Sequence, residues 1–189
     1  MAKIVMRFGE VVLRTSQYEA LKSWYSQVFD TKPMFESERR ESLGPGAMRR
    51  MCIIRPCSEF PFTESLVIFN FAELRQNDGT VSGMDHFQMQ FASIDHLFDR
   101  YEALAGHGIV PTRSANHGPS TSFYYCDPDG NRVELSVKNY ATEAETLVFM
   151  QSEAFRRNPA GIDVDPAEYV GRYRKGVSLE ELRRIPSST

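Results

Sequence analysis

The chain has 189 residues, of which 41% are hydrophobic and 25% charged, a composition typical of a folded globular protein of one domain or two small modules that share a core. The formal net charge of −3 leaves no excess of basic residues for nucleic acid, and no apolar run approaches the roughly 20 residues of a membrane-spanning helix. The three cysteines are odd in number and form no CxxC motif, and the first residues are too mixed for a signal peptide. We therefore expect a cytoplasmic protein without a nucleic-acid or membrane partner.

The first half of the sequence indicates a strand, a helix and three further strands. Residues 8–14 alternate and are rich in Val and Leu, as in a strand. Thr15 or Ser16 offers a helix N-cap, with Glu19 at the capping-box spacing from Ser16, and apolar residues then recur at helical intervals until just before Pro33. The other elements expected here are strands at 34–38, 48–55 and 66–71, a turn at 41–46 and a loop at 56–64.

After the turn sequence at 77–79, the same order of elements begins again. A strand at 84–91 precedes a helix that Ser93 or Asp95 can cap and that ends near Gly106 or Gly108. A short strand at 109–112 and a loop at 114–119 follow. Alignment of Glu10 with His86, an offset of 76 residues (86 − 10), also brings the two helices into rough register. The sequence therefore indicates a duplicated strand–helix–strand–strand–strand module.

The second copy ends in a hairpin at residues 122–135. An aromatic strand enters the sequence Asp-Pro-Asp-Gly-Asn, in which Pro sets φ for a turn and Gly or Asn accepts positive φ. The hairpin places Tyr124 on one arm and Glu134 on the other. A carboxylate among the strand residues Val133 and Leu135 is costly to bury unless a partner, such as a metal ion, compensates its charge.

The remainder of the chain, from residue 140, indicates helices. A helix is expected at 143–156, ending at the Asn-Pro-Ala-Gly sequence 158–161. Asp165 followed by Pro166 is a typical helix start, and a short helix is expected at 178–184. We expect this segment to pack on the rest of the fold or on a second subunit.

The hairpin pattern, the internal repeat and the run from Phe155 to Pro166 resemble the vicinal oxygen chelate superfamily, which includes glyoxalase, fosfomycin-resistance and extradiol dioxygenase relatives. The pattern is most similar to small two-module catechol or dihydroxybiphenyl dioxygenases. The resemblance implies an α+β fold in which two paired βαβββ modules, at 1–75 and 80–140, form a cup-shaped mixed sheet. A helical C-terminal extension at 141–189 would complete one compact domain.

The same resemblance implies a metal site made of Glu10, His86 and Glu134. Extradiol dioxygenases normally use two His and one Glu, which leave open positions on Fe(II) for a catecholate and O₂. Here Glu10 occupies the place of the first His. Carboxylate-rich sites suit Fe(II), Mn(II) or Mg(II), with Fe(II) the first expectation. Glu10 has two other interpretations, a general base or a solvated strand end in a site without metal.

Two further residues are candidates for catalysis. Tyr124 precedes Glu134 by ten positions (134 − 124), a spacing at which the resemblance implies a hydroxyl that hydrogen-bonds the substrate oxygen near the metal. His117, on the loop before this strand, could act as an acid or base. A packed aromatic ring and an exposed loop histidine are the structural alternatives. His96 and His107, on and after the second expected helix, are interpreted as structural.

The sequence thus predicts a metal-dependent oxidoreductase that resembles extradiol dioxygenases. Its substrate would be a hydroxylated aromatic, catechol-like or polyketide-derived, chelated through vicinal oxygens, and a homodimer is expected. One alternative is an isomerase, lyase or cyclase with Glu10 as base, and another is a non-catalytic small-ligand-binding protein. A glyoxalase site with four ligands is disfavoured because the strand at 66–71 contains no Glu.

Overall fold

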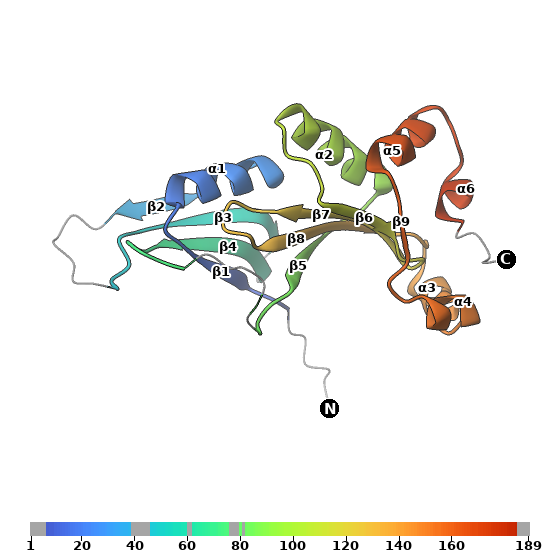
Figure 1. The fold of residues 1–189 in the computed structure, drawn as a ribbon, viewed down its shortest axis with the longest axis horizontal. Coiled ribbons are helices and arrows are strands. Elements are labelled where there is room, and N and C mark those ends of the chain that lie inside the picture. Colours follow the sequence, from blue (N-terminus) through green and yellow to red (C-terminus); the bar gives the residue numbers. More distant parts are fainter. Residues whose placement is uncertain (1–6, 39–45, 60–61, 76–79, 81, 185–189) are drawn as a thin grey trace. The chain divides into compact units, whose positions relative to one another are not determined.

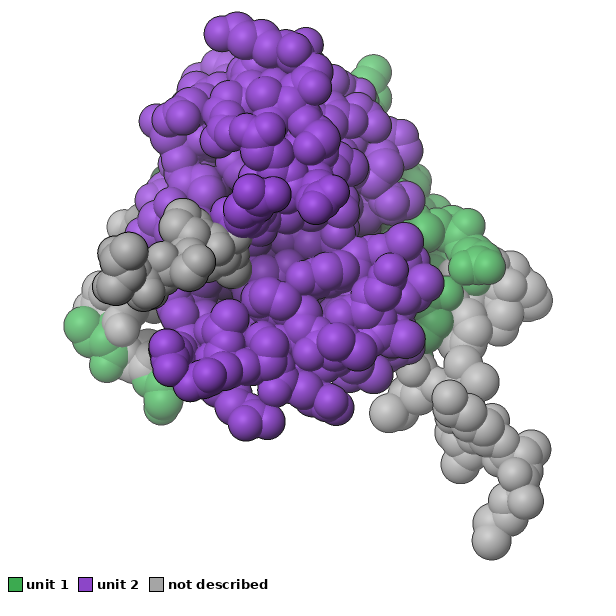
Figure 2. All heavy atoms as spheres, turned by 90° about the vertical axis from the view of Figure 1, so that its right-hand side faces the viewer, with its two compact units in different colours: residues 1–82, 127–131 green, residues 83–126, 132–189 purple. Residues whose placement is uncertain are grey.

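The computed structural model describes residues 7–38, 46–59, 62–75, 80 and 82–184. The chain divides into two compact units, one made of Met1–Ser82 with Asp127–Asn131 and the other of Gly83–Cys126 with Arg132–Thr189 (Figures 1 and 2). The expected break at 77–79 and all but the last residue of the expected turn at 41–46 lie outside the described residues.

The first unit contains a four-stranded mixed sheet with the strand order β1-β4-β3-β2 and one helix (Figure 1). Strands β1 and β4 run parallel, whereas β3 pairs antiparallel with both β4 and β2. The elements are β1 (Glu10–Thr15), α1 (Tyr18–Val28), β2 (Phe35–Glu38), β3 (Arg50–Glu59) and β4 (Phe62–Asn70).

The helix α1 covers one face of this sheet. Its buried residues recur at helical spacing, so they form one apolar stripe directed at β3 and β4. Strand residues alternate between the two faces, and the buried set on the helix side includes Leu13, Ile54 and Ile68. Glu10, by the same alternation, belongs to the opposite face. The buried residues of α1 are Tyr18, Leu21, Tyr25 and Val28.

Two expectations for the first unit are wrong. The N-cap of α1 is Gln17, without a side-chain cap, because Thr15 still belongs to β1 and its Oγ1 accepts the Gln17 N–H at 2.7 Å. The loop expected at 56–64 is instead mostly strand, since β3 continues to Glu59 and β4 begins at Phe62. Pro56 lies within the shift of register between Ile54 and Cys57, where a residue that lacks an N–H is tolerated.

The second unit repeats this order and adds the C-terminal elements. Its five-stranded sheet has the order β5-β8-β7-β6-β9, with β5 and β8 parallel and the other pairs antiparallel. The elements of the repeat are β5 (His86–Phe91), α2 (Ile94–Gly106), β6 (Arg113–Asn116), β7 (Ser120–Cys126) and β8 (Arg132–Lys138). The C-terminal elements are α3 (Glu143–Met150), α4 (Glu153–Arg157), β9 (Ile162–Asp163), α5 (Pro166–Arg174) and α6 (Leu179–Arg183).

The structure confirms the internal repeat. Strand β1 begins at Glu10 and β5 at His86, and each pairs in parallel with the last strand of its own module. Helix α2 covers one face of the second sheet, where Phe98 stacks on Phe123 with ring centroids 6.2 Å apart. Ser93 caps this helix by accepting the His96 N–H, as expected. The expected α+β fold of two βαβββ modules with helices at the C-terminus is therefore confirmed.

Two boundaries in the second unit differ from expectation. The strand predicted at 109–112 is absent, and β6 lies at Arg113–Asn116, where a loop was expected. Pairing with β7 and β9 forms this strand, although its sequence is polar and small. The helix predicted at 143–156 is two helices, α3 and α4, because the Ser152 side chain caps a new helix by accepting the Phe155 N–H.

The C-terminal extension packs on the second unit. Asp165 caps α5 with Pro166 in its first turn, as expected. Helix α5 is tied to α2, since the Tyr173 hydroxyl donates to Asp95 at 2.8 Å and Arg174 pairs with Asp99 and Glu102. No helix in the described part of the chain is long and apolar enough to span a membrane.

Candidate active site

The candidate site lies on the face of the second sheet opposite α2. Register places Gln88 of β5, Glu134 of β8 and Tyr124 of β7 side by side in one row. Their neighbours Phe123 and Leu135 point to the other face and are fully or almost fully buried there. Polar residues therefore occupy one face of three adjacent strands, and the apolar core occupies the other.

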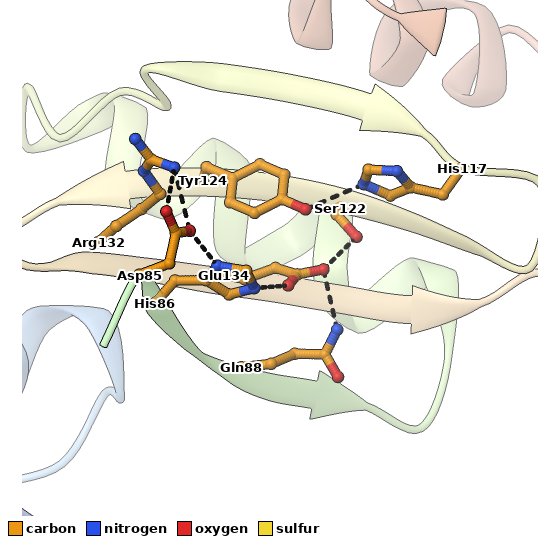
Figure 3. Close-up of polar contacts among 8 residues, drawn as sticks. All are labelled: Asp85, His86, Gln88, His117, Ser122, Tyr124, Arg132 and Glu134. Atoms are coloured by element: carbon orange, nitrogen blue, oxygen red, sulfur yellow. Dashed lines mark hydrogen bonds and ion pairs between the residues drawn. The ribbon is translucent and has the colours of Figure 1, made fainter. Parts of the chain in front are cut away.

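His86 and Glu134 form the centre of this face (Figure 3). His86 Nε2 lies 2.9 Å from Glu134 Oε2, and His86 Nδ1 lies 2.6 Å from Asp85 Oδ1. The Glu134 side chain is only 5% exposed, whereas that of His86 is 34% exposed. Arg132 in turn pairs with Asp85 at 3.2 Å. This chain of contacts fixes the orientation of the imidazole, because each of its nitrogens faces a carboxylate oxygen.

The other oxygen of Glu134 is also engaged. Oε1 accepts a hydrogen bond from Gln88 Nε2 at 2.8 Å and one from Ser122 Oγ at 2.6 Å (Figure 3). These hydrogen bonds, with the contact to His86, offset the cost of burying the carboxylate. Glu134 is therefore held on both oxygens, by different partners.

Tyr124 and His117 form a second pair on the same face. The Tyr124 hydroxyl lies 3.0 Å from His117 Nε2, and its ring meets that of His86 edge-on with centroids 5.6 Å apart. Burial raises the pKa of the Tyr124 hydroxyl. Burial lowers the pKa of His117. Both shifts favour the neutral forms, so the pair combines a phenol that donates with an imidazole that can accept.

The turn between β6 and β7 holds His117 in place. The His117 N–H donates to the Ser120 carbonyl at 2.9 Å. Asn116 Oδ1 accepts one hydrogen bond from the Gly118 N–H at 2.8 Å and another from Asn139 Nδ2 at 3.1 Å. Gly118 has a φ of +89°, which favours glycine. His117 lies before β7 and is half-buried, and its role as an acid or base stays a prediction.

The C-terminal extension reaches this pair, which the sequence did not suggest. Arg113 donates hydrogen bonds to Asp163 Oδ1 at 2.9 Å and to the Ala160 carbonyl at 3.2 Å. Its guanidinium lies 5.6 Å from the centre of the Tyr124 ring. A Cβ on Gly161 would lie 2.6 Å from the Cα of His117. The segment that carries β9 therefore supports the site as well as the sheet.

The structure thus brings together four of the five predicted residues: His86 with Glu134, and Tyr124 with His117. Glu10 lies at the exposed start of β1 in the first unit and remains a predicted ligand. Among the described residues, no three His, Cys, Asp or Glu side chains form a group that could hold a metal ion. His96 lies in α2 and His107 is its C-cap.

Three polar residues around the pair were not predicted: Asp85, Gln88 and Ser122. Alternation of His86 with Gln88 along β5 was the available signal for the glutamine. Ser122 could have been placed on the same face as Tyr124 by its spacing of two. Nothing in the sequence indicated that both side chains donate to one oxygen of Glu134.

The His86–Glu134 pair fits a divalent metal. An imidazole nitrogen and a carboxylate oxygen suit Fe(II), Mn(II) or Mg(II). Metal–ligand distances of about 2.1 Å place two ligand atoms at right angles about 3.0 Å apart. The observed separation of 2.9 Å matches that spacing. The contact of Nδ1 with Asp85 favours a hydrogen on Nδ1, which leaves Nε2 to face the metal.

A duplicated βαβββ fold with His and Glu on the face of its second sheet opposite α2 defines a class of small α+β proteins, and comparison identifies the family. Residues 7–135 match the model of the Glyoxalase/Bleomycin resistance protein/Dioxygenase superfamily, and the chain belongs to this family. It is 37% identical over 160 residues to biphenyl-2,3-diol 1,2-dioxygenase 2 of Rhodococcus globerulus, with 85% of this chain and 77% of the relative covered. It is 29% identical over 181 residues to biphenyl-2,3-diol 1,2-dioxygenase 3 of the same organism, with 95% and 88% covered.

Solved structures support the fold. A glyoxylase/bleomycin resistance protein/dioxygenase domain from Frankia sp. EAN1pec superposes with a TM-score of 0.57 at 18% identity, covering 75% of this chain and 98% of that one. A glyoxalase family protein from Enterococcus faecalis gives a TM-score of 0.50 at 18% identity, with 69% and 96% covered. At such identities the likeness concerns the fold alone.

Proposed function

We propose that the protein is a metal-dependent dioxygenase of the extradiol type, acting on a hydroxylated aromatic that binds through two vicinal oxygens. The observation that carries this proposal is the convergence of His86 Nε2 and Glu134 Oε2 at 2.9 Å beside the Tyr124–His117 pair. The 37% identity to a biphenyl-2,3-diol 1,2-dioxygenase supports the same reaction class.

In this proposal, His86 and Glu134 hold the metal, with Glu10 as the third ligand. Fe(II) is the first candidate, and Mn(II) or Mg(II) would also suit two carboxylates and one imidazole. When bound, the metal would supply Lewis-acid stabilisation of the substrate oxygens and a site for O₂. Asp85 keeps the imidazole of His86 in the tautomer that leaves Nε2 for the metal.

Tyr124 and His117 would act on the substrate. Tyr124 is protonated because burial raises its pKa, so its hydroxyl can donate to a substrate oxygen that gains negative charge. His117 is neutral because burial lowers its pKa, so Nε2 can accept the proton that a diol loses, either directly or through the Tyr124 hydroxyl. The proton leaves the substrate oxygen and stays on the imidazole until product formation.

The test combines metal content with oxygen uptake. Protein purified without a metal-affinity tag is analysed for iron and manganese, and O₂ consumption is then followed with catechol and 2,3-dihydroxybiphenyl. We expect about one metal per chain, and uptake that His86→Ala and Glu134→Ala abolish. Gln90→Met is the matched control, since Gln90 lies on β5 opposite Ser136 and not opposite Glu134. Stoichiometric metal with turnover that consumes no O₂ would contradict the dioxygenase proposal.

One observation favours a second candidate. The first residue of β1 is Glu10, at the position that corresponds to His86 in the repeat, where a second His was the other possibility. Glu10 is exposed. An exposed carboxylate there could act as the base of an isomerase, lyase or cyclase. Turnover without O₂ that Glu10→Gln abolishes would support this candidate. Ligand binding without any turnover would instead indicate a non-catalytic binding protein. The homodimer expected from the sequence remains a prediction.

A further inference from the structure

The two carboxylate oxygens of Glu134 have different partners. Oε1 accepts from Gln88 Nε2 and from Ser122 Oγ, at 2.8 Å and 2.6 Å, whereas Oε2 faces His86 Nε2 (Figure 3). The two donors come from opposite sides, because β5 and β7 are the two neighbours of β8 in the sheet. Ser122 is fully buried. Hydrogen bonds from the two neighbouring strands therefore fix the orientation of the Glu134 carboxylate.

A carboxylate oxygen has about two lone-pair sites. Two donors at hydrogen-bond distance use both sites of Oε1, so Oε1 has none left for a metal. Oε2, which faces His86, remains available. A carboxylate held in this way can ligate through one oxygen only, unless Gln88 or Ser122 first gives up its hydrogen bond.

We propose that Gln88 and Ser122 are positioning residues that keep Glu134 a ligand through Oε2 alone. This inference rests on the proposed function, which places a metal at His86 and Glu134. A six-coordinate metal with three single-atom protein ligands has three positions left, enough for both oxygens of a vicinal diol and for O₂. A carboxylate that binds through both oxygens would occupy one of these positions. The two hydrogen bonds would thus protect a coordination site for substrate or O₂.

A purely structural role for the same residues predicts a different outcome. If Gln88 and Ser122 only offset the buried charge of Glu134, their removal lowers stability but leaves the way in which Glu134 binds metal unchanged. The number of water molecules left on the metal separates the two roles, because a carboxylate that binds through both oxygens displaces one of them. Bound Mn(II) reports this number through the relaxation rate of the water protons.

The experiment uses Gln88→Met, Ser122→Ala and the double variant in the full chain. The matched controls are Gln90→Met and Ser120→Ala, which lie two residues away on the same strands, opposite Ser136 and Lys138. Affinity for Mn(II) and Fe(II) is measured by chelator competition, the water-proton relaxation of the Mn(II)-loaded protein is recorded, and the melting temperature is measured without metal.

We expect each single variant to change metal affinity about 10- to 100-fold. We also expect the double variant to hold about one water molecule fewer on Mn(II) than the wild type, and both controls to match the wild type. Wild-type water-proton relaxation of Mn(II) in the double variant, whether or not its metal affinity changes, would overturn this inference and leave the proposed function standing. A wild-type protein that binds neither metal would overturn both.

Discussion

Gly161 offers the sharpest test of whether the C-terminal extension supports the site. Its φ is +75°, and a Cβ at this position would lie 2.3 Å from the Asn116 carbonyl oxygen and 2.6 Å from the His117 Cα. Gly161→Ala therefore combines two costs, the left-handed backbone conformation and an overlap with main chain. Since main-chain atoms cannot rotate away, either β9 must leave β6 or the turn that carries His117 must shift.

The chain contains a control that separates these costs. Gly108 has the same φ of +75° and nothing within 4 Å of its Cβ position, so Gly108→Ala carries the conformational cost alone. That cost is about 1–2 kcal/mol. The overlap at Gly161 should add about 1–3 kcal/mol, the usual range for overpacking. We expect losses of unfolding free energy of about 1–2 kcal/mol for Gly108→Ala and about 2–5 kcal/mol for Gly161→Ala, from the two ranges combined.

Urea unfolding of the metal-free protein measures both losses, and oxygen uptake measures the consequence for His117. We expect Gly161→Ala to lower turnover at saturating substrate, whereas Gly108→Ala keeps wild-type turnover. Equal stability of the two variants would refute the reasoning, because the overlap with the Asn116–His117 main chain would then cost nothing. A destabilised Gly161→Ala with normal turnover would show that the extension supports the sheet but not the site.

Three further predictions concern single side chains. Tyr25→Phe removes a 2.8 Å hydrogen bond to the buried Asp127 carboxylate and should lower the unfolding free energy in urea by about 1.5–3 kcal/mol. Tyr125→Phe, the control, removes a buried hydroxyl that has no hydrogen-bond partner among the described residues and should be close to neutral. Equal losses in the two variants would contradict this account. His117→Gln should lower turnover about 10²- to 10⁴-fold if this imidazole accepts the substrate proton. Because burial lowers the pKa of His117, the wild type should keep its base down to a lower pH than an ordinary histidine allows, and the acid limb of its rate profile should disappear in the variant. Glu10→His should raise metal affinity and O₂ uptake if the glutamate is a weaker replacement ligand, and an inactive variant with unchanged metal content would instead favour Glu10 as a base.

The fold was largely predictable because its signals are local. The turn sequence at 127–131 and the alternation around it fix the β7–β8 hairpin, and Gly130 adopts the positive φ that this turn requires. The hairpin alone places Tyr124 opposite Glu134, as observed in the register. Helical spacing identified α1 and α2, and Asp165 with Pro166 marked the start of α5. In each case a few neighbouring residues carry the information.

The parts that the sequence missed depend on distant partners. Strand β6 consists of Arg-Ser-Ala-Asn, which has little β-propensity, and pairing with β7 and β9 makes it a strand. Strand β9 is only two residues long and exists because Ile162 pairs with Asn116, 46 positions earlier (162 − 116). The two donors to Glu134 Oε1 come from strands on both sides of β8, so only the assembled sheet brings them together.

The two sheets differ in the row that corresponds to the candidate site. In the second sheet, the row across β5, β8 and β7 is Gln88, Glu134 and Tyr124. The corresponding row across β1, β4 and β3 of the first sheet is Val12, Val67 and Ile53. The strands of the two sheets pair in the corresponding way, so the first sheet shows that apolar residues in this row are sufficient for folding. Buried polar groups cost free energy unless they are paired, so stability alone gives no reason for a carboxylate at position 134. The polar row therefore indicates a requirement other than folding, and in the function that we propose a metal ligand and a hydrogen-bond donor to the substrate would meet that requirement.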